Sequence, residues 1–195
     1  MSLLRIALAG EGGQGVQSVA EILAEAAYNS DQQAIYIPNF GLEQRGGVSI
    51  AFLQFSDQRI GAPRFNKADI VIALSNRAIS RTAIYSDDNT LFVYDASITA
   101  PPEDFPKQSK QLLPLPALDI SNQRLHPRVF NIVIMGAVIG LTHAVSFDAA
   151  KDALEHKLKA KFEASPDLRL LNFKAMEIGT ELAQQALSKG GLANV

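Results

Sequence analysis

The hydrophobic and polar positions switch between strand-like and helix-like periods along the first half of the chain. An apolar run at residues 3–9 meets a glycine-rich turn, after which apolar positions recur at helical spacing from Val16 onward. Ser75 can cap a further short helix. Other strand-like runs occupy residues 33–37, 48–56, 68–74 and 90–95. Strands separated by helices predict an α/β fold of three layers, with a Rossmann-like start and a mostly parallel sheet that has helices on both faces.

The second half of the chain has a different pattern. Residues 101–116 are rich in proline and are expected to form an exposed excursion with one short strand. Residues 129–141 are apolar all round, which predicts a buried helix, and Gly136 and Gly140 give it a smooth face for close packing. Residues 146–189 are predicted to form two more helices. The C-terminal part is therefore expected to be helical.

Composition limits the classes of protein to consider. A length of 195 residues suits a single domain, residues 1–195, and 47% apolar with 19% charged residues is ordinary for a globular protein. The net charge of −2 does not favour binding to nucleic acid or to an anionic membrane, both of which attract basic proteins. The apolar stretch near the N-terminus is too short for a signal peptide, so a cytoplasmic protein is expected.

The sequence contains no cysteine. The chain therefore cannot carry a disulfide, a thiolate zinc site or an iron–sulfur cluster of its own. Any redox centre must belong to another chain.

The turn after the first strand has the glycine spacing G-x-G-x-x-G at Gly10, Gly12 and Gly15. This spacing lets the backbone turn sharply and approach a phosphate at a helix N-terminus, although the same turn can serve only to pack helix on strand. Hydrolysis of nucleoside triphosphates is disfavoured, because Val16 occupies the position at which a Walker-type phosphate loop needs lysine. A dinucleotide site is disfavoured because no acid follows Ile37 at the end of the second strand.

A second glycine-rich segment spans residues 38–47. Its Arg45 lies beside Gly46 and Gly47, and a guanidinium there suits a phosphate, a carboxylate or an acidic group of a partner. The alternative is an ion pair with Glu43 that only braces the loop.

Other candidates are less informative. Asp95 and Ser97 follow a strand at the edge where ligands bind, and turn formation explains them equally well. Asn131 is expected to be a buried polar group with a structural role. No serine-nucleophile motif is present, so no catalytic residue is assigned. No metal site is assigned either, because the histidines are scattered: His126, His143 and His156.

With these residues in view, the sequence resembles the gamma subunit or gamma domain of the 2-oxoacid:ferredoxin oxidoreductases, which act on pyruvate, ketoisovalerate, 2-oxoglutarate or indolepyruvate. The motifs that carry this resemblance are Gly10-Glu11-Gly12-Gly13-Gln14-Gly15-Val16 with residues 22–27, residues 41–43 with Arg45-Gly46-Gly47, Asn131 with Met135-Gly136-Ala137, and residues 172–179. Leu42 is a departure from the family pattern, since many relatives have proline there.

The resemblance implies a multisubunit enzyme that decarboxylates a 2-oxoacid, reduces ferredoxin and releases an acyl-coenzyme A. Thiamine diphosphate and iron–sulfur clusters are then expected on the partner subunits, which are alpha, beta and, where present, delta. The isolated chain is expected to be inactive, and it can form a homodimer. The 2-oxoacid itself is not specified. The implied coenzyme A-binding residues are Gly10, Gly12, Gly13, Gln14, Gly15, Gly41, Glu43, Arg45, Gly46 and Gly47.

Two alternatives to this function stay open. In the first, the chain is a non-catalytic assembly module whose glycine loops contact only partner subunits. In the second, it is a dinucleotide-binding, Rossmann-like oxidoreductase, which the missing acid after Ile37 disfavours.

Overall fold

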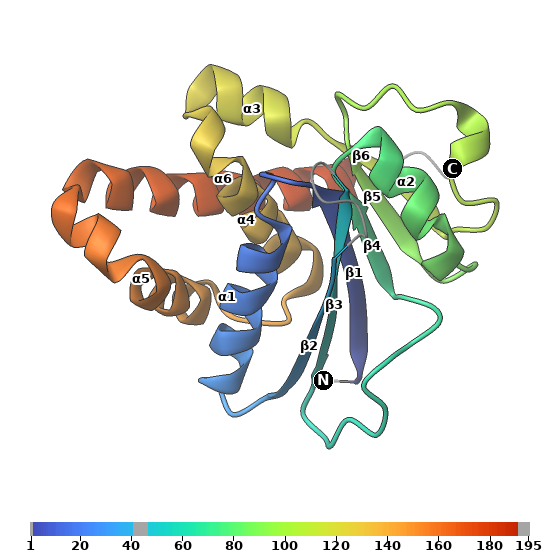
Figure 1. Ribbon diagram of the computed structural model, residues 1–195, viewed down its shortest axis with the longest axis horizontal. Helices are drawn as coiled ribbons and strands as arrows, with labels where there is room; N and C mark the ends of the chain where they lie inside the picture. Colours follow the sequence, from blue (N-terminus) through green and yellow to red (C-terminus); the bar gives the residue numbers. More distant parts are fainter. Residues whose placement is uncertain (1, 41–46, 191–195) are drawn as a thin grey trace.

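The computed structural model describes residues 2–40 and 47–190, and within them six strands form one mixed, mostly parallel sheet (Figure 1). The strands lie in the order β2-β3-β1-β4-β5-β6. Strands β1, β4, β5 and β6 pair in parallel, whereas β3 is antiparallel to both of its neighbours. The strands are β1 Leu4–Glu11, β2 Gln33–Asn39, β3 Val48–Ser56, β4 Ile70–Ala73, β5 Leu91–Asp95 and β6 Gln111–Leu115.

The antiparallel direction of β3 follows from the length of the chain before it. Strand β2 ends at Asn39 and β3 begins at Val48. A parallel pair needs a crossover of a dozen or more residues, which residues 40–47 cannot provide. The β2–β3 pair is therefore antiparallel.

Helices cover both faces of the sheet, as predicted, but unequally (Figure 1). Helices α1, α4, α5 and α6 share one hydrophobic core with the sheet, and α2 packs on the opposite face. The helices are α1 Val16–Tyr28, α2 Asn76–Thr82, α3 Ala117–Arg124, α4 Phe130–Thr142, α5 Phe147–Ala164 and α6 Pro166–Gly190, with short 3-10 turns η1 Ala83–Tyr85, η2 Pro102–Asp104 and η3 Pro127–Val129. All but α3 and the 3-10 turns η2 and η3 correspond to helices predicted from the sequence.

Alternation along β1 divides its side chains between the two faces. Ile6 and Leu8 belong to the core under α1 and α4, whereas Ala7 and Ala9 belong to the smaller core under α2. Successive residues of a strand point to opposite faces. All four side chains are fully buried, which explains why the run reads as continuously apolar.

The predicted close packing of the C-terminal helices is confirmed. A methyl group added at Gly136 of α4 would overlap the carbonyl oxygen of Met176 in α6, and one added at Gly179 of α6 would overlap the carbonyl oxygen of Val133. One added at Gly140 would lie 2.6 Å from the carbonyl oxygen of Thr180. The two backbones therefore touch. In the described part of the chain, no helix combines the length and hydrophobicity needed to cross a membrane.

The proline-rich segment is less exposed than expected. Its strand, β6, is the edge of the sheet beside β5, and the side chains of Leu113 and Leu115 are buried in the larger core. Pro114 lacks an N–H and is tolerated because an edge strand has one unpaired side. The segment therefore contributes to the core as well as to the surface, and α3 follows it directly.

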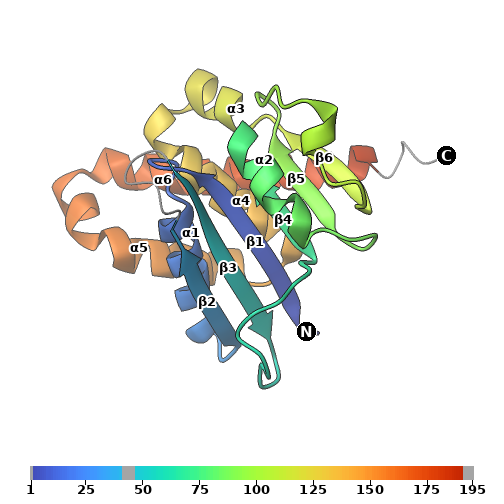
Figure 2. The ribbon, with the colours of Figure 1, turned by 45° about the vertical axis from the view of Figure 1, so that its right-hand side comes forward.

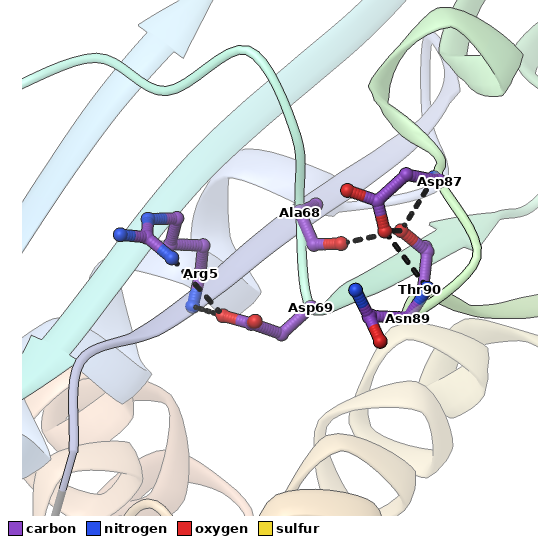
Figure 3. Close-up of polar contacts among 6 residues, drawn as sticks. All are labelled: Arg5, Ala68, Asp69, Asp87, Asn89 and Thr90. Atoms are coloured by element: carbon purple, nitrogen blue, oxygen red, sulfur yellow. Dashed lines mark hydrogen bonds and ion pairs between the residues drawn. The ribbon is translucent and has the colours of Figure 1, made fainter. Parts of the chain in front are cut away.

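Polar side chains join the amino ends of three parallel strands (Figure 3). The Asp69 carboxylate accepts a hydrogen bond of 2.7 Å from the backbone N–H of Arg5. The buried Thr90 hydroxyl donates to the carbonyl oxygen of Ala68 at 2.6 Å and accepts from the N–H of Asp87 at 2.9 Å. These groups satisfy backbone atoms at the edge of the sheet opposite the glycine-rich turn, so their role is structural.

Candidate functional site

The glycine-rich turn lies between β1 and α1, at the edge where the parallel strands end (Figure 1). From β1 the chain passes through α1 toward β2 on one side, whereas β4 pairs with β1 on the other. Ligands of open α/β sheets bind outside the carboxyl ends of strands at such a change of direction. The predicted phosphate loop is therefore placed where this fold favours a ligand.

Gln14 holds the turn in shape. Its side-chain oxygen accepts a hydrogen bond of 2.7 Å from the N–H of Glu11, and its side-chain nitrogen donates to the carbonyl oxygen of Leu74 at 2.8 Å. Gly10 makes this possible, because a Cβ there would lie 2.6 Å from the Gln14 oxygen. The amide of Gln14 thus links the turn to the end of β4.

Two other glycines have backbone conformations that favour glycine. Gly13 has φ +93° and Gly15 has φ +72°. No side chain caps α1, for which Gly15 is the N-cap. The N–H groups of Gly12, Gly13 and Gly15 donate to no acceptor within residues 2–40 and 47–190. Together with the first turn of α1, they form a group of available donors at a helix N-terminus.

Asn131 lies against this turn, which the sequence did not indicate. A Cβ at Gly15 would lie 2.8 Å from both Cβ and Nδ2 of Asn131, in the first turn of α4. Asn131 is half-buried, not buried as expected, and the described residues include no hydrogen-bond partner for its amide. Hydrophobic periodicity placed Asn131 only on a buried helix. The structure adds its amide to the wall of the candidate site.

The second glycine segment falls mostly outside the described residues. Gly41, Glu43, Arg45 and Gly46 lie there, so their predicted roles stay predictions. Gly47 is half-buried and immediately precedes β3, whose first residue pairs with Glu11 at the end of β1. The end of the second motif is thus adjacent to the first.

Three side chains anchor α1 beside the site. The side-chain nitrogen of Gln17 donates to the hydroxyl of Ser49 at 2.5 Å, and the hydroxyl of Tyr36 donates to the side-chain oxygen of Gln17 at 2.6 Å. Burial, with a smaller contribution from the carboxylate of Glu21, raises the pKa of Tyr36 above its ordinary value. Tyr36 therefore acts as a neutral donor that joins β2 to the start of α1.

The structure decides between the two roles left open for Asp95. Its carboxylate is buried and accepts hydrogen bonds from the N–H of Ser97 at 3.0 Å and the N–H of Leu118 at 2.9 Å. One oxygen shapes the turn after β5 and the other satisfies the start of α3. Asp95 and Ser97 are therefore structural.

The histidines lie apart from one another and from the glycine-rich turn. His126 accepts a hydrogen bond at the start of η3, His143 ends α4 with φ +50°, and Nδ1 of His156 lies 2.6 Å from Oε1 of Glu25. Over the described ranges, no group of three or more His, Cys, Asp or Glu side chains could hold a metal ion.

The sequence profile of one family, pyruvate ferredoxin/flavodoxin oxidoreductase, matches residues 5–182. The chain belongs to this family. The resemblance to its gamma subunit or gamma domain, inferred from the two glycine motifs and the helical tail, is confirmed. Among oxidoreductase relatives, the 2-oxoglutarate synthase subunit KorC of Methanocaldococcus jannaschii is 31% identical over 186 residues, which cover 91% of this chain and 94% of KorC.

Other oxidoreductase relatives are longer. The ketoisovalerate oxidoreductase subunit VorA of Methanothermobacter thermautotrophicus is 28% identical over 184 residues, and the match covers 93% of this chain but 37% of VorA. The chain therefore spans little more than a third of that relative.

Solved oxidoreductase structures share the fold. The gamma subunit of a keto/oxoacid ferredoxin oxidoreductase from Geobacter sulfurreducens is 26% identical, with a TM-score of 0.75 over 95% of this chain and 99% of that one. A 2-oxoglutarate:ferredoxin oxidoreductase from Magnetococcus marinus, solved with 2-oxoglutarate, coenzyme A and succinyl-CoA bound, is 24% identical, with a TM-score of 0.84 over 95% of this chain and 32% of that one.

Proposed function

We propose that the chain is the gamma component of a multisubunit 2-oxoacid:ferredoxin oxidoreductase and that its glycine-rich turn binds the phosphates of coenzyme A. Membership of the family supports the first part. The observation that carries the second is the set of N–H donors at Gly12, Gly13 and Gly15, beside the N-terminus of α1, with no acceptor in the part of the chain that is described.

The proposed cofactors divide between subunits according to the chemistry of this chain. With no cysteine, it offers no thiolate for an iron–sulfur cluster, and it contains no recognisable thiamine motif. Thiamine diphosphate and the clusters are therefore assigned to alpha, beta or delta subunits, which also deliver electrons to ferredoxin. The role left for this chain is to bind and orient coenzyme A and to pack against its partners.

Backbone donors suit the pyrophosphate of coenzyme A for two reasons. A helix N-terminus carries partial positive charge, and its first N–H groups lack intrahelical acceptors. Arg45, which follows β2, is proposed to add a charge-assisted hydrogen bond, worth about 1.5–3 kcal/mol when well placed. The side-chain amide of Asn131 is available to hydrogen-bond a further phosphate oxygen.

A matched pair of substitutions at Gly13 tests the site. A Cβ at Gly13 meets nothing within 4 Å, so aspartate and asparagine fit there with the same backbone strain and differ mainly in charge. In the assembled enzyme, Gly13→Asp should raise the KM for coenzyme A about tenfold relative to Gly13→Asn, because its carboxylate repels the phosphates. Decarboxylation that does not need coenzyme A should be equal in the two variants.

Arg45→Ala separates coenzyme binding from assembly. A coenzyme role predicts an intact complex with a raised KM for coenzyme A, whereas an assembly role predicts loss of the subunit on gel filtration and failure of every partial reaction. Arg59→Ala, at an exposed arginine, is the control. Equal coenzyme A dependence of the Gly13 pair, with the complex intact, would refute the proposed binding site and leave the assembly role.

A further inference from the structure

One edge of the sheet is open. Strand β2 is the outermost strand on this side, and its one strand neighbour within the described residues is β3 (Figure 2). Over residues 2–40 and 47–190, the backbone of residues 33–39 forms no hydrogen bond outside this pairing. An edge strand presents a row of unpaired N–H and C=O groups, which can pair with a strand of another chain.

The register of the sheet shows which groups β2 directs outward. The carbonyl oxygen of Arg5 in β1 accepts a hydrogen bond from the N–H of Asp69, on the β4 side. Because backbone groups alternate in direction along a strand, those of Ile6 face β3, where Ile6 lies opposite Leu53. The backbone groups of Leu53 therefore face β1. Tyr36 of β2 lies opposite Leu53, so its N–H and C=O point away from β3.

Two other residues of β2 have the same orientation. Ala34 and Pro38 lie two residues on either side of Tyr36, so their backbone groups also face outward. Pro38 has no N–H to donate, which limits full pairing to residues 33–37. The other edge strand, β6, is shorter, contains Pro114 and directly follows Lys110. Proline and lysine both discourage pairing at an edge, so β2 is the better candidate.

The sequence of this edge is complementary to itself. None of residues 33–39 is charged. In an antiparallel pair of two β2 strands centred on Ile35, Ala34 of each copy lies opposite Tyr36 of the other, and each such pair exchanges two hydrogen bonds. Ile35 then lies opposite Ile35 of the second copy, and Gln33 lies opposite Ile37. This register buries no charge and requires no N–H from Pro38.

Two exposed aromatic side chains flank the edge. Tyr28 ends α1 shortly before β2 and is 75% exposed, and Phe40 directly follows β2 and is 67% exposed. Such exposure is unusual for large side chains of this kind. Antiparallel pairing places the end of one β2 beside the start of the other, so Phe40 of one copy approaches Tyr28 of the second copy.

The geometry points to an interface between two copies of this chain, which pair through β2 about a two-fold axis at Ile35. The two sheets then form one continuous sheet. A second copy is the occupant because a two-fold interface needs a surface that is complementary to itself, and this strand provides one. The interface goes beyond the proposed binding of coenzyme A and does not depend on it.

Cysteine cross-linking of the purified chain tests the pairing, because the native sequence contains no cysteine. In Ile35→Cys the substituted residues of the two copies lie opposite each other. Their Cα atoms are then about 4.5 Å apart, within the range of about 4.4–6.8 Å that a disulfide spans. Oxidised glutathione should therefore link most of this variant into dimers.

Two variants of the same strand test the register. In Gln33→Cys the Cα atoms of the substituted residues are about 14 Å apart, so this variant should stay unlinked. Ile37→Cys should also stay unlinked by itself. A mixture of Gln33→Cys and Ile37→Cys chains should form a disulfide, because these two positions lie opposite each other across the axis.

Charge at the centre of the strand provides a second measurement. Ile35→Lys removes an apolar pair and places two like charges opposite each other, which should raise the Kd of the dimer about tenfold in analytical ultracentrifugation. Ile35→Glu should do the same. Mixing the two variants should restore the dimer, since opposite charges then meet. Leu112→Lys, at a residue of β6 that is 41% exposed, is the control and should leave the Kd unchanged.

Several results would overturn the proposal. A wild-type chain that sediments as a monomer at every concentration is one. Equal cross-linking of Ile35→Cys, Gln33→Cys and Leu112→Cys would show random collision, and a dimer that Ile35→Lys does not weaken would use another surface. Failure of Ile35→Lys, but not of Leu112→Lys, to join the assembled enzyme, with the wild-type chain monomeric alone, would assign the edge to a partner subunit instead.

Discussion

The side-chain nitrogen of Gln14 donates a 2.8 Å hydrogen bond to the carbonyl oxygen of Leu74. The two residues belong to different strand–helix units, and the bond joins the glycine-rich turn after β1 to the end of the neighbouring parallel strand β4. The loop is thus held by tertiary structure and not by its glycines alone. A preformed array of backbone donors loses less conformational entropy when a ligand binds.

Replacing Gln14 by leucine should therefore weaken both stability and coenzyme binding. The N–H of Glu11 and the carbonyl of Leu74 lose their partners, and a buried unsatisfied polar group costs about 1–3 kcal/mol. Urea denaturation should show a loss in this range, and the KM for coenzyme A should rise in the assembled enzyme. Gln184→Leu, at an exposed position of α6, is the control. Equal stability of Gln14→Leu and wild type would contradict the bracing role.

Alanine at Gly15 should be far more harmful than alanine at Gly13. Both residues have positive φ, which costs an alanine about 1–2 kcal/mol. Only Gly15 also faces an obstacle, since its new methyl would lie 2.8 Å from Asn131, and overpacking adds about 1–3 kcal/mol. Free energies of unfolding for the two variants test this. Similar losses would mean that Asn131 moves away readily.

Gly136→Ala should disrupt the contact between α4 and α6. Its methyl meets the backbone of Met176, which cannot rotate away as a side chain could. We expect a loss of stability of at least about 1–3 kcal/mol, measured by thermal or urea unfolding. Gly61→Ala is the matched control because a Cβ there meets nothing within 4 Å. An unchanged melting temperature for Gly136→Ala would show that the helices can separate at no cost.

The ion pair between α5 and α6 should make stability depend on pH in the acidic range. Two hydrogen bonds from Arg169, at 2.8 and 2.9 Å, hold the pKa of Glu155 below its ordinary value. A carboxyl with a lowered folded-state pKa stabilises the protein above its unfolded pKa, about 4.3 for glutamate, and loses that contribution as pH falls through the folded value.

Wild type should therefore be more stable than Glu155→Gln at neutral pH, and the two should converge at acidic pH. The Arg169 and Glu155 side chains are 41% and 40% exposed, so solvent screens the pair, and the stability difference should be small and should shrink at high salt. Urea unfolding across pH 7 to about pH 3 would measure it. Glu181→Gln provides a control at an exposed position of α6. A difference that persists at acidic pH would rule out the ion pair as its source.

The isolated chain should not oxidise any 2-oxoacid in the presence of coenzyme A and a dye acceptor. It has no cysteine to ligate an iron–sulfur cluster and no recognisable thiamine motif, and both centres are proposed to lie on partner subunits. Activity should appear only after reconstitution with partner subunits. Turnover by the purified chain alone would show that a catalytic centre has been overlooked.

Local sequence was sufficient to predict most elements and the position of the glycine-rich turn. The switch from an apolar run to helical periodicity at Val16 depends only on neighbouring residues, and so does the cap at Ser75, whose side chain accepts an N–H group as expected. The smooth face of Gly136 and Gly140 was also visible, because residues four apart share one side of a helix.

Tertiary structure decided what lies around that turn. Asn131 meets Gly15, and Leu74 meets Gln14, across separations that no periodicity within one element can report. The position of β3 between β2 and β1 and the burial of β6 depend on pairing with distant strands, whereas hydrophobic pattern records only which residues avoid water. A pocket lined by Phe40, Phe52 and Phe65 likewise exists because β2, β3 and the segment around Phe65 converge on a part of the sheet face that α2 leaves uncovered.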